Sequence, residues 1–95
     1  MDKITTTIKR QWLAEIIAGT KKVEFREIKE YWENKLSDVS VPFEMRLING
    51  MSQNAPEVTV LINKIRRNSR KCVFELHIGK VIKFKNWDAR RGCPT

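Results

Sequence analysis

Apolar and polar side chains alternate one by one along the segment PFEMRLING, and this pattern is incompatible with an amphipathic helix. Phe43, Met45 and Leu47 fall on one face of an extended chain, opposite Glu44 and Arg46. In a helix the same residues would be spread around the circumference. We therefore predict a strand here, with its apolar face in the core.

Four more segments have strand character, because β-branched residues are frequent in them or because apolar and polar residues alternate. They are KITTTIK, KVEFRE, EVTVLINKI and KCVFELHIGKVIKF. The segment RRNSR between the last two is typical of a hairpin tip, and Gly79 is expected to bend or end the last strand. The Asn-Gly pair and the proline of NGMSQNAP predict a loop.

Two short helices are predicted from apolar residues that recur at helical spacing. The first, RQWLAEIIAG, carries its apolar stripe at Trp12, Leu13, Ile16 and Ile17. The second, IKEYWENKL, carries Ile28, Trp32 and Leu36 in register. Gly19 is expected to end the first helix in a left-handed conformation, which glycine adopts at little cost.

The length of 95 residues predicts a single domain, residues 1–95, with a modest core. With 41% apolar and 32% charged residues, the composition is that of a globular protein and not of a disordered one. Five or six mostly antiparallel strands with two short helices near the start predict a small α+β domain. A curled sheet or barrel would leave the fewest free strand edges.

The segment GTKKVEFR places three charged residues beside a predicted strand. We expect Val23 and Phe25 to face the core, which leaves Glu24 and Arg26 on the other face. Lys21 lies at the start of the strand, and a groove lined by Lys21, Glu24 and Arg26 would form if the following helix folded back over them. A carboxylate between two cations keeps its charge and orients them as donors for a phosphate or a polar ligand. The alternative is a solvated strand face with a surface ion pair of little energetic consequence.

The run from Gly19 to Arg26 fits the signature G-x-K-x-x-E-x-R, and in this the chain resembles the ASCH domain, a branch of the PUA-like superfamily. The resemblance includes the preceding strand and helix and the segment EIKEYW after the signature. In PFEMRLINGMSQNAPEVTV and FELHIGKVI the chain resembles a small phage and bacterial subgroup. The resemblance covers most of the chain and implies a small PUA-like β-barrel flanked by helices, with a cleft beside the signature.

What the resemblance implies about function is binding of RNA, as proposed for ASCH domains by analogy with PUA domains. Lys21 matches the family's cleft lysine, Glu24 its signature acid and Arg26 its signature arginine. Some relatives are amidohydrolases acting on acetylated cytidine, and some are reported to be ribonucleases. The amidohydrolases use a threonine where this chain has Glu24, so their chemistry is disfavoured here.

Three residues outside the signature are candidates for the rim of the cleft. Tyr31 is free to stack on a base if Trp32 is in the core, although an ordinary boundary tyrosine would give the same pattern. Asn49 begins a polar loop that is able to read base edges, or that merely connects a hairpin. Arg46 lies on the polar face of its strand near that loop, and we expect its charge close to the cleft.

Basic residues are concentrated in the second half of the chain. The formal net charge is +8, and from Ile48 to Thr95 there are ten basic residues and three acidic ones. This asymmetry is typical of proteins with a polyanionic partner, most commonly nucleic acid. A basic patch at the hairpin is expected to contact phosphates, or else to be a solvated loop. Its residues are Arg66, Arg67, Arg70 and Lys71.

The remaining chemically active residues give no motif for catalysis or metal binding. His77 and Glu75 share one face of a strand and are able to pair. Cys72 lies in an apolar run and is predicted to be a reduced core residue, whereas Cys93 lies near the C-terminal end. We therefore predict no metal and no cofactor. A disulfide between the two cysteines stays open at this point.

We expect a cytoplasmic protein with no membrane partner, because the chain shows no secretory signal and no long apolar run. The leading hypothesis is binding of RNA, of another single-stranded nucleic acid or of a nucleotide-like ligand in the cleft. One alternative is a small hydrolase, a ribonuclease or a modified-nucleoside amidohydrolase, that uses Lys21 and Glu24. Another is a protein-interaction domain of a phage or mobile element. The sequence does not predict the oligomeric state.

Overall fold

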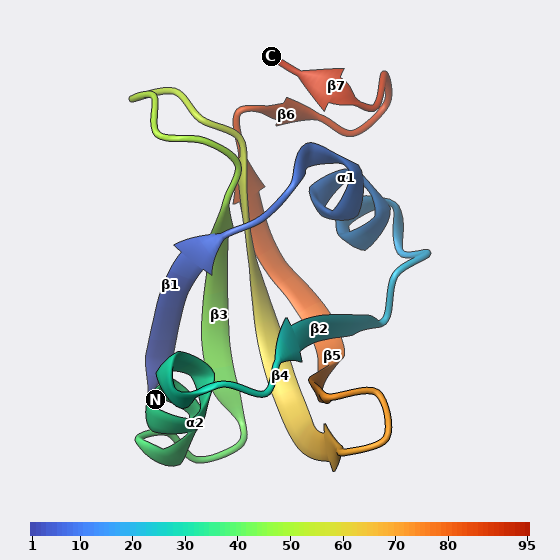
Figure 1. The fold of residues 1–95 in the computed structure, drawn as a ribbon. Coiled ribbons are helices and arrows are strands. Elements are labelled where there is room, and N and C mark those ends of the chain that lie inside the picture. The colour runs from blue at the N-terminus through green and yellow to red at the C-terminus, as the bar shows by residue number, and fades with distance from the viewer.

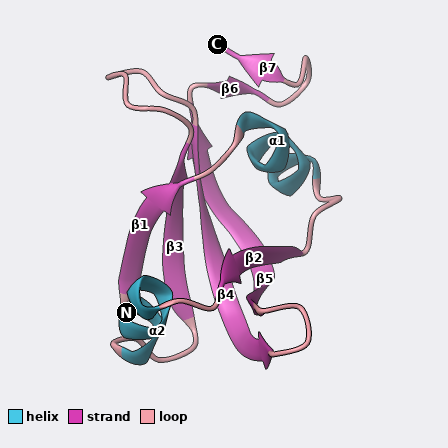
Figure 2. Ribbon diagram, viewed as in Figure 1, coloured by secondary structure: helices cyan, strands magenta, loops and turns pink.

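The computed structural model describes residues 1–95. Figure 1 shows the fold along the chain, and Figure 2 shows the distribution of helices and strands. In chain order the elements are β1 (Lys3–Thr7), α1 (Arg10–Ala18), β2 (Val23–Glu27), α2 (Glu30–Ser37), β3 (Phe43–Ile48), β4 (Glu57–Asn68), β5 (Val73–Lys85), β6 (Trp87–Asp88) and β7 (Cys93–Pro94).

Strands β1 to β5 form one curled sheet with the order β1-β3-β4-β5-β2. The pair β1–β3 is parallel, and the other three pairs are antiparallel. The sheet curls into a half-barrel, so its two edge strands, β1 and β2, turn toward each other (Figure 1). Strands β6 and β7 form a separate small sheet. The predicted α+β fold with a curled, mostly antiparallel sheet is confirmed.

The core fills the concave side of this sheet. Phe43, Met45 and Leu47 are fully buried, while the residues between them are only half-buried, as the alternation in β3 predicts. Their antiparallel neighbours on β4 point to the same side and are also fully buried. Those neighbours are Val58, Val60 and Ile62.

Both helices pack against the concave side and complete the core (Figure 1). Leu13 and Ile16 of α1 are buried, and so are Trp32 and Leu36 of α2, which confirms both predicted apolar stripes in their main positions. Trp12 is an exception, because its side chain lies at the edge of the stripe and is 37% exposed. The expectation that Trp12 belongs to the core is therefore wrong.

The end of α1 sets the path of the chain into β2. Gly19 has the predicted left-handed conformation, with φ of 85°. The amides of Thr20 and Lys21 both donate to the carbonyl of Glu15, at 3.0 and 3.1 Å. These bonds satisfy a carbonyl at the helix end and fix Lys21 just before the strand.

The β4–β5 hairpin is longer than its sequence predicts. β4 continues to Asn68, so Arg66 and Arg67 belong to the strand and not to the hairpin tip. Gly79 does not end β5, which runs on to Lys85. Register shifts in the β4–β5 pair lie opposite this glycine, and a Cβ atom at Gly79 would come within 2.7 Å of the Asn63 amide nitrogen. Gly79 therefore lies at the irregular part of the β4–β5 pair, where the side chain of Asn63 packs over it.

The two cysteines are both free thiols. Cys72 is exposed and has a φ of 56°, because it occupies the turn just before β5 begins. The prediction that Cys72 lies in the core is thus wrong, because the strand starts only at Val73 and its buried face begins at Phe74. The C-terminal segment packs through Trp87, which is buried as expected. No helix here has the length and apolar character that crossing a membrane requires.

Candidate functional site

β2 presents Glu24 and Arg26 to the concave side of the sheet, which is the reverse of the sequence prediction. Glu24 is paired with Leu76 of β5, a fully buried core residue, and only 4% of Glu24 is exposed. Phe25 points the opposite way and is 50% exposed. The expectation that Val23 and Phe25 face the core is therefore wrong. The physical reason is that Glu24 finds two cations on the concave side, which compensate for its lost hydration.

Glu24 lies at the centre of a compact ion cluster. Its Oε1 is 3.5 Å from Nζ of Lys21, and its Oε2 accepts a 2.5 Å hydrogen bond from Nη2 of Arg26. All three side chains are largely shielded from solvent. With a cation beside each oxygen, the carboxylate is arranged to hold the two cations in place.

Arg26 also bridges the two edge strands of the half-barrel. Its Nη2 donates a second hydrogen bond, of 2.9 Å, to the carbonyl of Thr7 at the end of β1. The guanidinium lies 5.1 Å from the centre of the Trp32 ring, so α2 supports it from the other side. Nε of Arg26 is buried without a hydrogen-bond partner in the chain.

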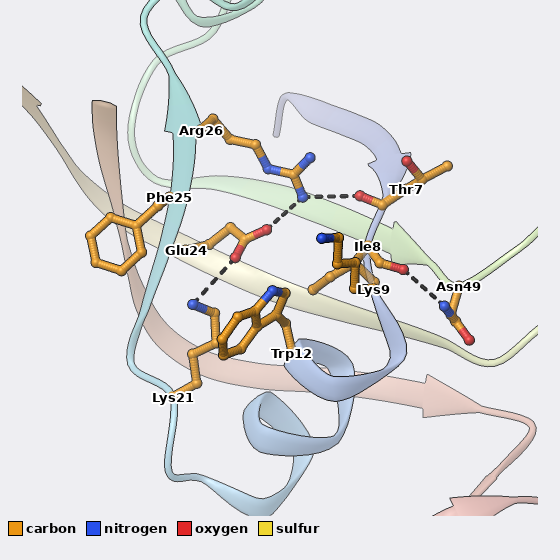
Figure 3. A pocket seen from close by; sticks show the side chains of 9 residues that line it. All are labelled: Thr7, Ile8, Lys9, Trp12, Lys21, Glu24, Phe25, Arg26 and Asn49. Atoms are coloured by element: carbon orange, nitrogen blue, oxygen red, sulfur yellow. Dashed lines mark hydrogen bonds and ion pairs between the residues drawn. The ribbon is translucent and has the colours of Figure 1, made fainter. Parts of the chain in front are cut away.

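Lys21 is held between two aromatic rings. Its Nζ lies 4.9 Å from the centre of the Trp12 ring and 5.0 Å from that of Phe25. Figure 3 shows Trp12 reaching from α1 toward Lys21, with Phe25 on the other side of β2 from Glu24. The ammonium group has three donors but only one carboxylate neighbour, so it retains donors for a ligand. Both rings keep an exposed surface on which a planar group is able to stack.

These residues line a hollow of about 640 Å³, which we call the Lys21 hollow (Figure 3). It lies between the end of β1, α1 and β2, and Asn49 forms part of its wall. Nδ2 of Asn49 donates to the carbonyl of Ile8, and Nε of Arg10 donates to Oδ1 of Asn49, both at 3.0 Å. The full lining is Thr7, Ile8, Lys9, Trp12, Lys21, Glu24, Phe25, Arg26 and Asn49.

The structure thus brings Lys21, Glu24, Arg26 and Asn49 together, but the covering helix differs from the expected one. The Lys21 hollow is flanked by α1, which precedes the signature, and not by α2, which follows it. The reason is the tight turn at Gly19, which brings α1 back beside β2. α2 reaches the cluster only through the contact between Trp32 and Arg26.

Two predicted rim residues lie elsewhere. Tyr31 is exposed and packs edge-to-face on Trp32, at 5.3 Å between ring centres, and it does not line the Lys21 hollow. Arg46 also lies outside it, because its side chain is on the convex face of β3. There Nε of Arg46 donates a 2.5 Å hydrogen bond to Oε2 of Glu57. This hydrogen bond and the charge of Glu57 raise the pKa of Arg46 above its usual value.

The basic patch at the hairpin does not line the Lys21 hollow either. Arg67 turns to the concave side, where it pairs with Glu33 of α2 and stacks on Phe74. Arg66 takes the convex side, with its Nε 3.9 Å from Oε1 of Glu75. Arg70 and Lys71 are exposed at the turn. The four residues therefore do not form one surface.

His77 and Glu75 share one face of β5, as expected, with Nε2 of His77 3.9 Å from Oε1 of Glu75. The pKa of Glu75 lies below its ordinary value, chiefly because the side chain of Asn68 donates a hydrogen bond of 2.9 Å to it. Nearby positive charge, first that of Arg66, lowers this pKa further. Nε2 of His77 is buried and has no hydrogen-bond partner in the chain.

Sequence reasoning missed the two aromatic residues of the site, Trp12 and Phe25. Both were assigned to the core because each falls in an apolar stripe. The signal available for Phe25 was its position between two charged residues of the signature. If Glu24 and Arg26 point inward to form a site, the alternation of a strand makes Phe25 point outward. Thr7 and Lys9 were missed because contacts between elements distant in sequence bring them to the site, among them the bond from Arg26 to the Thr7 carbonyl.

Comparison of the chain with protein-family models, with curated proteins and with solved structures finds no match. Membership of the ASCH family therefore stays a prediction, which depends on the signature from Gly19 to Arg26 and its flanking segments.

Proposed function

We propose that the protein binds RNA, or a nucleotide-like ligand, in the Lys21 hollow. The observation that carries this proposal is the ammonium group of Lys21 held between the exposed rings of Trp12 and Phe25. Single-strand binders combine cations with aromatic platforms, because the cations attract the backbone and every base has a face that stacks. The excess of positive charge over the whole chain adds a long-range attraction for such a ligand.

The carboxylate of Glu24 gives the hollow a further property that suits a base. Nucleobases carry donors and acceptors on one edge, and the cluster presents cationic donors around a single acceptor group. A phosphate alone would favour cations that extend into solvent away from their carboxylate, whereas Lys21 and Arg26 are shielded and held against Glu24. We therefore infer that a base enters beside Glu24, while its phosphate lies toward the exposed Lys9 at the rim.

The test is a binding titration with fluorescein-labelled single-stranded RNA and with single nucleotides at low salt, followed by fluorescence anisotropy. Lys21→Ala is expected to weaken binding by about 10- to 100-fold, as for loss of a charged hydrogen-bond donor. Lys22→Ala is the matched control, because Lys22 is exposed and lies outside the hollow. Absence of any binding, or equal losses in both variants, would overturn the proposal.

The same protein samples distinguish the two alternative functions, a hydrolase and a protein-interaction domain. A hydrolase that uses Lys21 and Glu24 would cleave RNA or deacetylate acetylated cytidine, and Lys21→Ala would remove that turnover. The engagement of both Glu24 oxygens by cations favours binding over this chemistry. A protein-interaction domain would bind a protein partner but no RNA, and Lys21→Ala would not affect it.

A further inference from the structure

A second hollow, of about 540 Å³, lies on the convex side of the sheet at the end nearest α1. We call it the Arg46 hollow. Its walls are β1, the loop between β3 and β4, the start of β4 and the end of β5. The lining residues used below are Thr7, Arg46, Gly50, Ser52, Glu57 and Lys85.

The charges of the Arg46 hollow repeat the plan of the Lys21 hollow. Glu57 is buried, with Oε2 bonded to Arg46 and Oε1 3.9 Å from Nζ of Lys85. The two cations extend into solvent, since 42% of the Arg46 side chain and 61% of the Lys85 side chain are exposed. One shielded carboxylate thus anchors two accessible cations, which leaves a net positive charge toward the opening.

The two hollows share a wall. Thr7 lines both of them, and it is exposed. Asn49 lines the Lys21 hollow, whereas its neighbours Ile48 and Gly50 line the Arg46 hollow. The wall is held by backbone bonds, from the amide of Ile8 to the carbonyl of Ile48 at 3.0 Å, and from the amide of Asn49 to the carbonyl of Pro56 at 2.8 Å.

The hairpin end of the molecule offers cations but no comparable hollow. It lies at the far end of β4 from the β3–β4 loop (Figure 1). β4 has 12 residues, so its two ends are roughly 35 Å apart at the usual rise of a strand. Glu75, the cross-strand neighbour of Phe25, also places a carboxylate between Phe25 and the hairpin, where it would repel a phosphate.

We propose that single-stranded nucleic acid spans both hollows and crosses the shared wall at Thr7. Arg46 and Lys85 hold the phosphate of the following nucleotide, while the phosphate of the nucleotide in the Lys21 hollow lies toward Lys9. This inference depends on the proposed function and adds the path of the strand. The hydroxyl of Thr7 and the backbone amides of the β3–β4 loop supply uncharged donors along that path.

The inference is tested with oligouridylate RNA of one, two, three and six nucleotides, measured by anisotropy and by competition. The expected result for the wild-type protein is binding at least about tenfold tighter for three nucleotides than for one, as an added phosphate and a second site contribute. Lys85→Gln is expected to weaken binding of the three-nucleotide RNA by about three- to tenfold and to leave binding of a single nucleotide unchanged.

Lys85→Gln removes one of the two cations beside Glu57 and could therefore affect folding, so a second variant is needed that leaves both ion pairs intact. Ser52→Glu adds a negative charge on the exposed loop of the Arg46 hollow without touching the ion pairs, and the same selective loss is expected. The matched control is the double variant Arg70→Gln and Lys71→Gln, which removes two charges from the hairpin tip. In that control, the increase in affinity from one to three nucleotides is expected to be the same as in the wild-type protein.

The outcomes separate the two proposals. The path over Thr7 is wrong if a single nucleotide binds in a Lys21-dependent manner but longer RNA binds no tighter. It is also wrong if only the hairpin control loses the affinity gained between one and three nucleotides. In both cases the proposed binding in the Lys21 hollow is retained. If neither single nucleotides nor RNA bind, both proposals fall. Capture of a protein at the Arg46 hollow that competes with no RNA would also overturn the inference.

Discussion

Glu24 and Glu57 are each shielded carboxylates that anchor two cations, yet their surroundings differ in a way that separates two kinds of contact. The cations around Glu24 are themselves shielded, with 11% of the Lys21 side chain and 16% of the Arg26 side chain exposed. Around Glu57 the corresponding values are 42% for Arg46 and 61% for Lys85. Only the first cluster includes aromatic rings over a cation.

The difference follows from where the two glutamates lie on the sheet. Glu24 is on the concave face of an edge strand, under α1, so rings and backbone enclose it. Glu57 begins β4 on the convex face, where β3, the end of β5 and a loop adjoin it and no helix lines the hollow. The enclosed cluster suits recognition of a flat group in a fixed orientation, and the open one suits attraction of a phosphate that keeps some of its water.

The largest expected effect is on stability. Glu24→Ala would leave Lys21 and Arg26 shielded without their counter-charge, and we expect the free energy of unfolding to fall by about 3–5 kcal/mol. Glu57→Ala would leave two solvated cations, with an expected loss of about 1 kcal/mol. Urea titration followed by circular dichroism measures both. Equal losses, or a larger loss at Glu57, would show that the two clusters are energetically alike.

Next in size is the stacking energy of the aromatic platforms. Trp12→Ala and Phe25→Ala are each expected to weaken RNA binding by about 1–3 kcal/mol, as for loss of one base–ring contact. Because both rings are largely exposed, the unfolding free energy should change much less than for a core aromatic residue. Anisotropy and urea titration on the same samples give both values. Tyr31→Ala is the control, since Tyr31 lies outside both hollows.

A smaller effect is expected on salt dependence. Each phosphate contact with a single strand contributes about 0.7 to the slope of log affinity against log salt concentration. Lys85→Gln should therefore reduce the slope for six-nucleotide RNA by about that amount, whereas Trp12→Ala should leave the slope nearly unchanged. Affinities measured at four salt concentrations suffice. If the slope became shallower in Trp12→Ala but did not change in Lys85→Gln, the roles assigned to the two hollows would be reversed.

The smallest expected effect concerns a third carboxylate, Glu75, which serves as a reference for the other two. Its pKa is lowered from 4.5 in the folded protein, so its contribution to stability is complete above that pH and is lost as the pH falls through the folded value. The advantage of the wild-type protein over Glu75→Gln in unfolding free energy should therefore be present at pH 7 and shrink at pH 3. An advantage that grows at pH 3 would contradict the lowered pKa.

Much of the fold was predictable because it depends on local signals. The alternation in β3 needs only the period of an extended chain, and Gly19 needs only its freedom at positive φ. Trp32 and Leu36 were predicted correctly because their spacing matches a helix that packs on one side. The α+β class and the curled sheet follow from these elements together.

The orientation of β2 was not predictable by the same logic. Alternation shows which residues share a face, but the choice of the buried face depends on partners distant in sequence, and here an ion cluster replaced apolar side chains at an edge strand. Arg46 and Asn49 show the same limit. They are close in sequence, yet they line different hollows, because Arg46 projects from the convex face of β3 whereas Asn49, just past its end, bonds to the carbonyl of Ile8. That placement comes from the parallel β1–β3 pairing, which no local pattern reveals.

The link between Arg26 and the carbonyl of Thr7 bears on the exposure of the edge strands of the sheet. An open sheet exposes the backbone of its edge strands, which is a template for pairing with another chain. Here the two edges, β1 and β2, turn toward each other, and a guanidinium occupies a carbonyl of one of them. Arg26, which lines the Lys21 hollow, thus also occupies part of a sheet edge, so we expect replacement of Arg26 to change the hollow and to expose more of that edge.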